Sequence, residues 1–225
     1  MTCSSTQPLT AARPRHDSPT TLLVIAKEPL PGHVKTRLTP PFTPEQAAAL
    51  AEAALADTLD AVRRAPARRR ILVLDGTPGR WLSPGIDVVP QTTGSLDERL
   101  AAAFAACTDG PALLIGMDTP QLTPHLIAPA LAPAAWHGCD AWFGPAEDGG
   151  FWALGLAAPD PALVRGVPMS TAHTGALQRA RLTSAGLLVH DLPRLRDVDT
   201  APDAVAAAAA APASRFAALL ARFVS

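Results

Sequence analysis

The sequence predicts an α/β fold in which short buried strands alternate with helices. Two apolar runs, residues 21–26 and 111–116, have strand length and the unbroken hydrophobicity of strands that are covered on both faces. Helix starts are marked at Thr43, Ser95 and Thr200, each of which stands three positions before Gln, Glu or Asp in a capping-box pattern. Strands that alternate with capped helices favour a sheet with helices packed on its faces.

The remaining elements follow from the same signals. Leu50, Leu55 and Leu59 recur at helical spacing and give the first helix an apolar face for the sheet. Further elements are expected at helices 43–62, 95–107, 123–131 and 176–185, and at strands 71–74, 86–89, 140–143, 151–156 and 187–190. Two terminal helices, 202–210 and 212–224, are expected to cover the sheet.

The length of 225 residues suits one sizeable domain, which we expect over residues 21–225. Residues 1–20 are polar and rich in Pro, Ser and Thr, so we expect a disordered tail that is neither a signal peptide nor an anchor. Pro or charge interrupts every apolar run before it reaches the length of a membrane span. The sequence therefore predicts a single domain with no membrane span.

Charge and cysteine content narrow the partners and the compartment. The net charge of -1 gives no bulk electrostatic reason to expect nucleic acid or an acidic membrane as a partner. The three cysteines, Cys3, Cys107 and Cys139, lie far apart, which argues against a disulfide framework or a zinc site. This pattern fits a protein of the reducing cytoplasm.

A cationic loop follows the first strand. Lys27 ends the strand, and Pro29 and Gly32 prevent regular structure from continuing, so a loop presents Lys35 and Arg37. Open α/β sheets bind ligands at the carboxyl ends of their strands. The loop is not a P-loop because no glycine directly precedes Lys35, but two cations and several amides can neutralise a di- or triphosphate. The alternative interpretation is a solvated basic loop.

Acidic residues follow two other segments. Asp118 stands at the carboxyl end of the 111–116 strand, where a carboxylate facing the cationic loop suits a divalent metal that bridges phosphate oxygens. A turn or cap before Pro120 is the alternative role. Asp197 and Asp199 precede the last capping box and project to the same side if the chain is extended, as an acid pair available for metal.

Two loops supply further candidates. Gln91 and Gly94 follow the third strand, so they are candidates for contacts to a base or a sugar. Asp148 lies in the glycine-rich loop at 144–150, where it could contact an acceptor hydroxyl or the metal. The same loop residues would also make an ordinary hairpin turn.

Five motifs, in this order, carry a resemblance to a known family over residues 21–203. They are AKEPLPGHVKTRL at 26–38, QTTGSLDERL at 91–100, LLIGMDTPQL at 113–122, GPAEDGGFWALGL at 144–156 and DVDTAPD at 197–203. The chain resembles the uncharacterised glycosyltransferase-A-like proteins related to molybdenum-cofactor guanylyltransferase and phospholactate guanylyltransferase. Ser95, Asp97 and Met169 depart from the pattern of that family.

The resemblance implies a nucleotide-diphospho-sugar transferase fold of the GT-A, Rossmann-like kind: three α/β/α layers around a mostly parallel sheet. It also implies Mg²⁺ or Mn²⁺ on Asp118 and Asp199. The residues that it places at the nucleotide are Ala26, Lys27, Pro29, Gly32, Lys35, Arg37, Gln91 and Gly94.

The leading expectation is a metal-dependent transferase that uses a nucleotide-sugar donor and a small-molecule acceptor. Lys35 and Arg37 would hold the diphosphate, and Asp148 would be an acceptor-side base. One alternative is a nucleotidylyltransferase that moves a nucleoside monophosphate from a triphosphate to a phosphorylated small molecule. Another is a non-catalytic nucleotide-binding module, which the departures from the family pattern motivate.

Overall fold

The structure is a computed structural model that describes residues 18–224. Residues 1–17 of the predicted tail lie outside the described residues. Ser18 and Thr20 are buried, and the Thr20 hydroxyl donates a hydrogen bond of 3.0 Å to the carbonyl of Ala130. Among the helices of residues 18–224, none is both long enough and apolar enough to cross a membrane.

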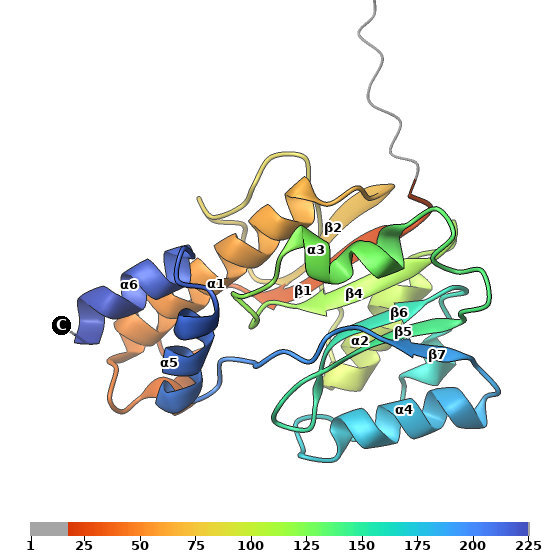
Figure 1. The fold of residues 1–225 in the computed structure, drawn as a ribbon. Helices are drawn as coiled ribbons and strands as arrows, with labels where there is room; N and C mark the ends of the chain where they lie inside the picture. Colours follow the sequence, from red (N-terminus) through yellow and green to blue (C-terminus); the bar gives the residue numbers. More distant parts are fainter. Residues whose placement is uncertain (1–17, 225) are drawn as a thin grey trace, which may run out of the picture.

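Seven strands form one sheet in the order β3-β2-β1-β4-β6-β5-β7 (Figure 1). The pairs β2–β3, β1–β2, β1–β4 and β5–β7 are parallel, and β6 runs antiparallel to both of its neighbours. The mostly parallel sheet that we expected is therefore confirmed. The strands are β1 (Thr21–Lys27), β2 (Arg69–Asp75), β3 (Asp87–Pro90), β4 (Ala112–Gly116), β5 (Ala141–Pro145), β6 (Phe151–Leu156) and β7 (Val189–Asp191).

The helices begin where the capping patterns predict. Thr43, Ser95 and Thr200 each form a capping box at the start of a helix. In a capping box, the side chains of the first residue and of the residue three positions later each accept a hydrogen bond from the other residue's backbone N–H. The α-helices are α1 (Pro44–Arg64), α2 (Leu96–Ala105), α3 (Pro124–Ile127), α4 (Thr174–Ser184), α5 (Ala201–Ala210) and α6 (Arg215–Val224). Short 3-10 turns lie at η1 (Thr36–Leu38), η2 (Ala128–Leu131) and η3 (Pro161–Leu163).

Alternating strand residues face two separate cores, which gives the three layers. Leu22 and Val24 of β1 pack with α1 and α3 on one face, whereas Leu23 packs with α2 and α4 on the other. Central strands buried on both faces need apolar residues at every position, which explains the unbroken runs in the sequence.

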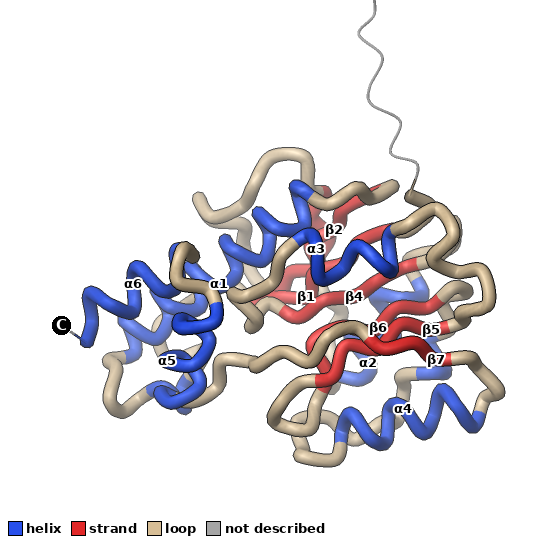
Figure 2. Tube along the Cα trace, viewed as in Figure 1, coloured by secondary structure: helices blue, strands red, loops and turns tan. Residues whose placement is uncertain are grey.

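The expectation that the terminal helices cover the sheet is wrong. Helices α5 and α6 pack beside the first turns of α1, away from the sheet (Figures 1 and 2). Leu50 of α1 shares a third core there with Phe216 and Leu220 of α6. The Asp57 carboxylate, which is 9% exposed, caps α6 by accepting hydrogen bonds from the backbone N–H groups of Arg215 and Phe216. Helix α1 presents this apolar face beyond the sheet, and the terminal helices bury it.

Candidate nucleotide site

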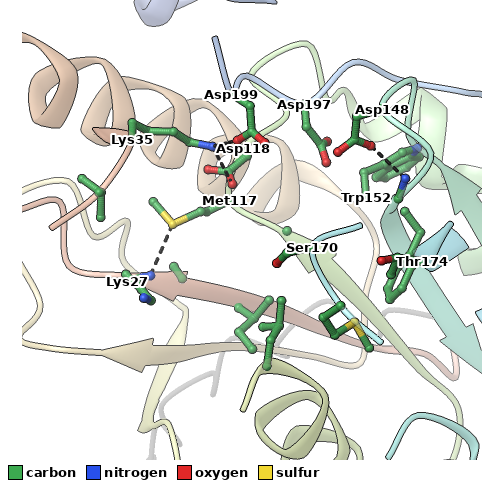
Figure 3. A pocket seen from close by; sticks show the side chains of 18 of the residues that line it. Lys27, Lys35, Met117, Asp118, Asp148, Trp152, Ser170, Thr174, Asp197 and Asp199 are labelled. Atoms are coloured by element: carbon green, nitrogen blue, oxygen red, sulfur yellow. Dashed lines mark hydrogen bonds and ion pairs between the residues drawn. The ribbon is translucent and has the colours of Figure 1, made fainter. Parts of the chain in front are cut away.

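A cleft of about 790 Å³ opens at the carboxyl ends of β1 and β4 (Figure 3). One wall comes from the cationic loop after β1, another from the acidic segment before α5, and a third from the loops around β6 and α4. The strand order explains this position, because β1 and β4 are neighbours and their following loops diverge from the same edge. The volume lies within the usual range for pockets that bind small molecules.

Lys35 lies at the centre of the cleft. Its backbone is in the left-handed region, with φ 49 and ψ 38, and it precedes the η1 turn. Its Nζ lies 2.8 Å from Asp118 Oδ2 and 3.0 Å from Asp199 Oδ1, and the side chain is 9% exposed. Burial alone would lower the pKa of Lys35, but the two carboxylates outweigh it and raise the pKa above its ordinary value. The ammonium is therefore a fixed positive charge in the cleft.

The chain uses lysine only here. Lys27 and Lys35 are its two lysines, both line the cleft, and the other 17 cationic side chains are arginines. A lysine ammonium is a compact point charge, whereas an arginine guanidinium is a broad planar fork. A single ammonium fits between two carboxylates, and it can move from them to a phosphate oxygen without a change in fork geometry.

Backbone contacts hold the acidic segment against the end of β4. The N–H of Val198 donates to the carbonyl of Asp118 at 3.0 Å, and Gln121 Nε2 donates to the carbonyl of Arg196 at 2.6 Å. These two bonds place Asp197 and Asp199 on either side of a fixed residue. Arg37, whose side chain is 70% exposed, reaches Asp199 Oδ2 at 3.3 Å. Solvent screens this second ion pair more than that of Lys35.

Asp197 is a half-buried acid of the cluster. Its pKa is raised to about 7, mainly by burial and also by the nearby charges of Asp118 and Asp148, while Lys35 opposes the rise. Its Oδ1 and the Oδ1 of Asp118 are buried oxygens without a hydrogen-bond partner. Figure 3 shows the Asp197 carboxylate between the Lys35 cluster and Asp148. Buried oxygens without partners are rare in proteins and mark a place where a cation or a donor is missing.

The oxygen donors fit a hard divalent cation. Within residues 18–224 no group of three or more His, Cys, Asp or Glu side chains is arranged to hold a metal ion. Mg²⁺ needs only one or two protein carboxylates when phosphate and water complete its shell. Asp118 and Asp197 each keep a buried oxygen without a partner, whereas both oxygens of Asp199 contact cations. Asp118 and Asp197 therefore each have an oxygen left for a cation, whereas Asp199 has none.

Asp148 lies on the far wall of the cleft, on the loop between β5 and β6. Its Oδ1 accepts a hydrogen bond of 2.8 Å from the N–H of Gly150. Gly149 has φ +89, and a Cβ there would lie 2.1 Å from the carbonyl oxygen of Ala172. Glycine is thus required for this loop to pack against the loop before α4. The latter loop contributes Ser170, whose φ of 58 is also in the left-handed region.

The other predicted nucleotide residues divide into two groups. Ala26, Lys27 and Gln91 line the cleft. Three do not line it: Pro29, Gly32 and Gly94. Gly32 and Gly94 have φ +75 and +120, so they shape the two loops through their backbone.

Sequence reasoning leaves two cleft residues without a specific assignment. It offers Asp197 together with Asp199 as an acid pair available for metal without choosing Asp197 as the ligand, and it names no ligand contact for Arg99. A capped helix that follows a strand end begins at the edge of the sheet where ligands bind, so side chains in its first turn can reach the ligand. The capping box at Ser95 could therefore have indicated Arg99 as a candidate.

Comparison with known proteins identifies the family. The family described as "Uncharacterized protein conserved in bacteria (DUF2064)" matches residues 47–171. The chain belongs to this family. It is also 33% identical over 184 residues to a phosphoenolpyruvate guanylyltransferase from Salinispora arenicola (strain CNS-205), with 79% of this chain and 83% of that protein covered.

Solved structures share the fold. A protein from Desulfovibrio desulfuricans G20, assigned to the nucleotide-diphospho-sugar transferases, is 27% identical with a TM-score of 0.81, and 91% of this chain and 95% of that one are covered. A 2-C-methyl-D-erythritol 4-phosphate cytidylyltransferase from Thermus thermophilus is 16% identical with a TM-score of 0.51, over 84% of this chain and 97% of that one. The second likeness shows the fold alone.

These findings confirm the expected fold and the enzyme class. The chain is a transferase of the nucleotidyl or nucleotide-sugar kind, in a nucleotide-diphospho-sugar transferase type fold. They support the alternative of nucleotidyl transfer better than the leading expectation of a nucleotide-sugar donor, because the Salinispora relative, 33% identical over 184 residues, is a guanylyltransferase. The non-catalytic alternative loses its support, since the relatives are enzymes.

Proposed function

We propose that the protein moves a nucleoside monophosphate from a nucleoside triphosphate to the phosphate of a small phosphorylated acid and releases pyrophosphate. One observation carries the proposal: Lys35 is a buried ammonium 2.8 Å from Asp118, at the edge where β1 and β4 end. The name of the Salinispora relative supports it and points to a phosphorylated carboxylic acid such as phosphoenolpyruvate as the acceptor.

In the proposed reaction an oxygen of the acceptor phosphate attacks the α-phosphorus of the triphosphate. The bond between the α-phosphorus and the bridging oxygen breaks, and that oxygen leaves with the electron pair as part of pyrophosphate. Lys35 and Arg37 both line the cleft and would neutralise the negative charge on the leaving group. Lys35 would exchange its ion pairs for contacts to phosphate oxygens as the triphosphate binds.

The nucleophile in this reaction needs no general base. A phosphate monoester has a second pKa near 6, so it is ionised at neutral pH. Asp148 then has no proton to remove, and we assign it to the acceptor wall, where it contributes negative charge next to Asp197. This differs from the role as a base that the sequence suggested for it, which a hydroxyl acceptor would require.

We assign the metal to Asp118 with Asp197, and we retain Asp199 as the residue that holds Lys35 and Arg37 in the ligand-free protein. Bound Mg²⁺ or Mn²⁺ would neutralise part of the negative charge of the triphosphate. The two oxygens without partners on Asp118 and Asp197 support this assignment.

Sugar transfer from a nucleotide sugar is the second candidate, favoured by the similarity to the Desulfovibrio protein. Here the same cations would stabilise a leaving nucleoside diphosphate, and Asp148 would act as a base on an acceptor hydroxyl. The two candidates differ in the released product, which is pyrophosphate in one and a nucleoside diphosphate in the other.

The test combines ligand binding with product analysis on the full chain. Thermal unfolding is measured with nucleoside triphosphates and nucleotide sugars, with and without Mg²⁺ or Mn²⁺, because a ligand at 100 times its dissociation constant adds about 2.7 kcal/mol. We expect metal-dependent stabilisation by a triphosphate, lost in Asp118→Asn and kept in Asp60→Asn, which changes a half-buried acid of α1 that pairs with Arg63 and Arg64 outside the cleft. Stabilisation by nucleotide sugars alone, followed by release of nucleoside diphosphate, would refute the proposal.

A further inference from the structure

The cleft continues past the acid cluster to helix α2. Its end there, which we call the α2 end, is lined by Ile25, Ala26, Gln91, Leu96, Arg99 and Leu100. Apolar side chains make its walls, and Gln91 and Arg99 are the polar side chains among these six. A flat, largely apolar ligand group with one polar edge matches this lining.

Gln91 has no donor left for a ligand. Its Nε2 donates to the carbonyls of Ala26, at 2.6 Å, and Val73, at 3.1 Å, so the amide is tied to β1 and β2. Its Oε1 accepts a hydrogen bond of 3.0 Å from Arg99 Nη1. Both the nitrogen and the oxygen of the Gln91 amide therefore make hydrogen bonds within the protein, and Gln91 holds Arg99 in position.

Arg99 has more donors than the protein satisfies. The side chain is 17% exposed and lines the cleft, and its Nη1 lies 3.7 Å from Asp75 Oδ2, beyond hydrogen-bond distance. Its Nε is a buried donor without a hydrogen-bond partner. A guanidinium carries five N–H donors and no acceptor, so any group that it recognises must present acceptors. A half-satisfied buried cation is costly unless a ligand completes its contacts.

We propose that Arg99 reads the 6-oxo edge of a purine base, with Gln91 as the positioning residue that aims it. The assignment rests on the proposed function, since it takes the nucleotide phosphates to lie at Lys35. Guanine offers two acceptors, O6 and N7, to an arginine fork, whereas adenine places an amino donor at position 6. A site with only donors therefore selects the oxo base and rejects the amino base.

The proposal is tested by the dissociation constants of GTP, ITP and ATP for the full chain with Mg²⁺, measured by calorimetry. ITP keeps the 6-oxo group of GTP but lacks its 2-amino group. We expect GTP and ITP to bind within about threefold of each other, and ATP to bind at least tenfold more weakly. ITP binding as weakly as ATP would overturn the proposal, because the 2-amino group would then carry the selection.

Variants of Arg99 distinguish recognition of the base from a purely structural role of this side chain. Arg99→Met should weaken GTP and ITP binding about 10- to 100-fold and leave ATP binding within threefold, so that the preference collapses. The matched control is Arg69→Met, which removes an exposed arginine of β2 that pairs with Asp87 of β3 outside the cleft. It should leave the dissociation constants of GTP, ITP and ATP unchanged. Equal losses for all three nucleotides in Arg99→Met would assign Arg99 to structure alone and overturn the proposal.

Arg99→Lys covers the case in which the methionine variant does not fold. Lysine keeps the charge but loses the fork, so we expect partial retention of the preference for GTP over ATP. A preference for ATP, or for CTP and UTP over GTP, in the wild-type chain would overturn the assignment of Arg99 while leaving nucleotidyl transfer intact. Binding of no nucleotide would instead refute the proposed function itself.

Discussion

Replacement of Lys35 by methionine should strengthen metal binding by the nucleotide-free protein. Lys35 Nζ lies 2.8 Å from Oδ2 of Asp118, one of the two proposed metal ligands, so in the wild-type chain the ammonium competes with a metal ion for that carboxylate. Methionine keeps the length and packing of the side chain but removes the charge. A divalent ion on Asp118 and Asp197 then becomes the group that compensates the Asp118 carboxylate.

The size of the effect follows from the contact between Lys35 and Asp118. A hydrogen bond to a charged group contributes about 1.5–3 kcal/mol when it is buried. Because the Asp118 side chain is 35% exposed, solvent screening reduces this contribution. For this contact, about 1–2 kcal/mol corresponds to roughly 5- to 30-fold in the dissociation constant of Mn²⁺.

The assay is a Mn²⁺ titration followed by electron paramagnetic resonance, without nucleotide. Lys27→Met is the control, since it removes the same charge from the same cleft and Lys27 has no ion pair with any residue of 18–224 in the structure. We expect its Mn²⁺ affinity to stay within about threefold of wild type. Unchanged or weaker Mn²⁺ binding by Lys35→Met would refute the reasoning that the ammonium and the metal compete for the Asp118 carboxylate.

Five further variants test the charges and the packing through urea unfolding of the ligand-free protein. Asp197→Asn should raise the free energy of unfolding by about 1 kcal/mol or more, because it removes a charge whose buried oxygen has no partner. Asp199→Asn should lower the free energy of unfolding, because it breaks two ion pairs. The opposite order of the two effects would contradict this assignment of charges. Gly149→Ala should cost at least about 2 kcal/mol more than Gly166→Ala, which bears only the backbone strain of φ +80 in open space; equal costs would show that the two loops can separate freely. Asp57→Ala should cost about 1–3 kcal/mol through loss of the α6 cap, and a cost below about 0.5 kcal/mol would mean that other contacts hold that helix.

The layered fold could be predicted because its signals are local. A capping box at Thr43 or Ser95 depends on residues within one turn, and an unbroken apolar run needs only to be buried on both faces. The position of α5 and α6 could not be predicted in the same way. Helical periodicity gives an apolar face but not its partner, and here the partner is the part of α1 around Leu50 that extends beyond the sheet.

The candidate site follows the same division. Strand ends in a mostly parallel sheet bring their loops to one edge, and this places Lys35 beside Asp118 as the sequence suggested. The burial of each acid in the irregular segment before α5 could not be predicted in this way. It depends on two distant hydrogen bonds, from Val198 and Gln121, which turn Asp197 inward. The sequence near the two acids contains no pattern that predicts these long-range bonds, so our proposal of Asp197 as the metal ligand depends on the structure.

The central claim is tested most directly by phosphorus NMR of the full chain with Mg²⁺, a nucleoside triphosphate and a panel of small phosphorylated carboxylic acids. Our account predicts pyrophosphate together with a new diphosphate diester that joins the nucleoside monophosphate to the acceptor, both absent with Asp118→Asn. Release of nucleoside diphosphate from a nucleotide sugar, with no pyrophosphate from any triphosphate, would contradict it.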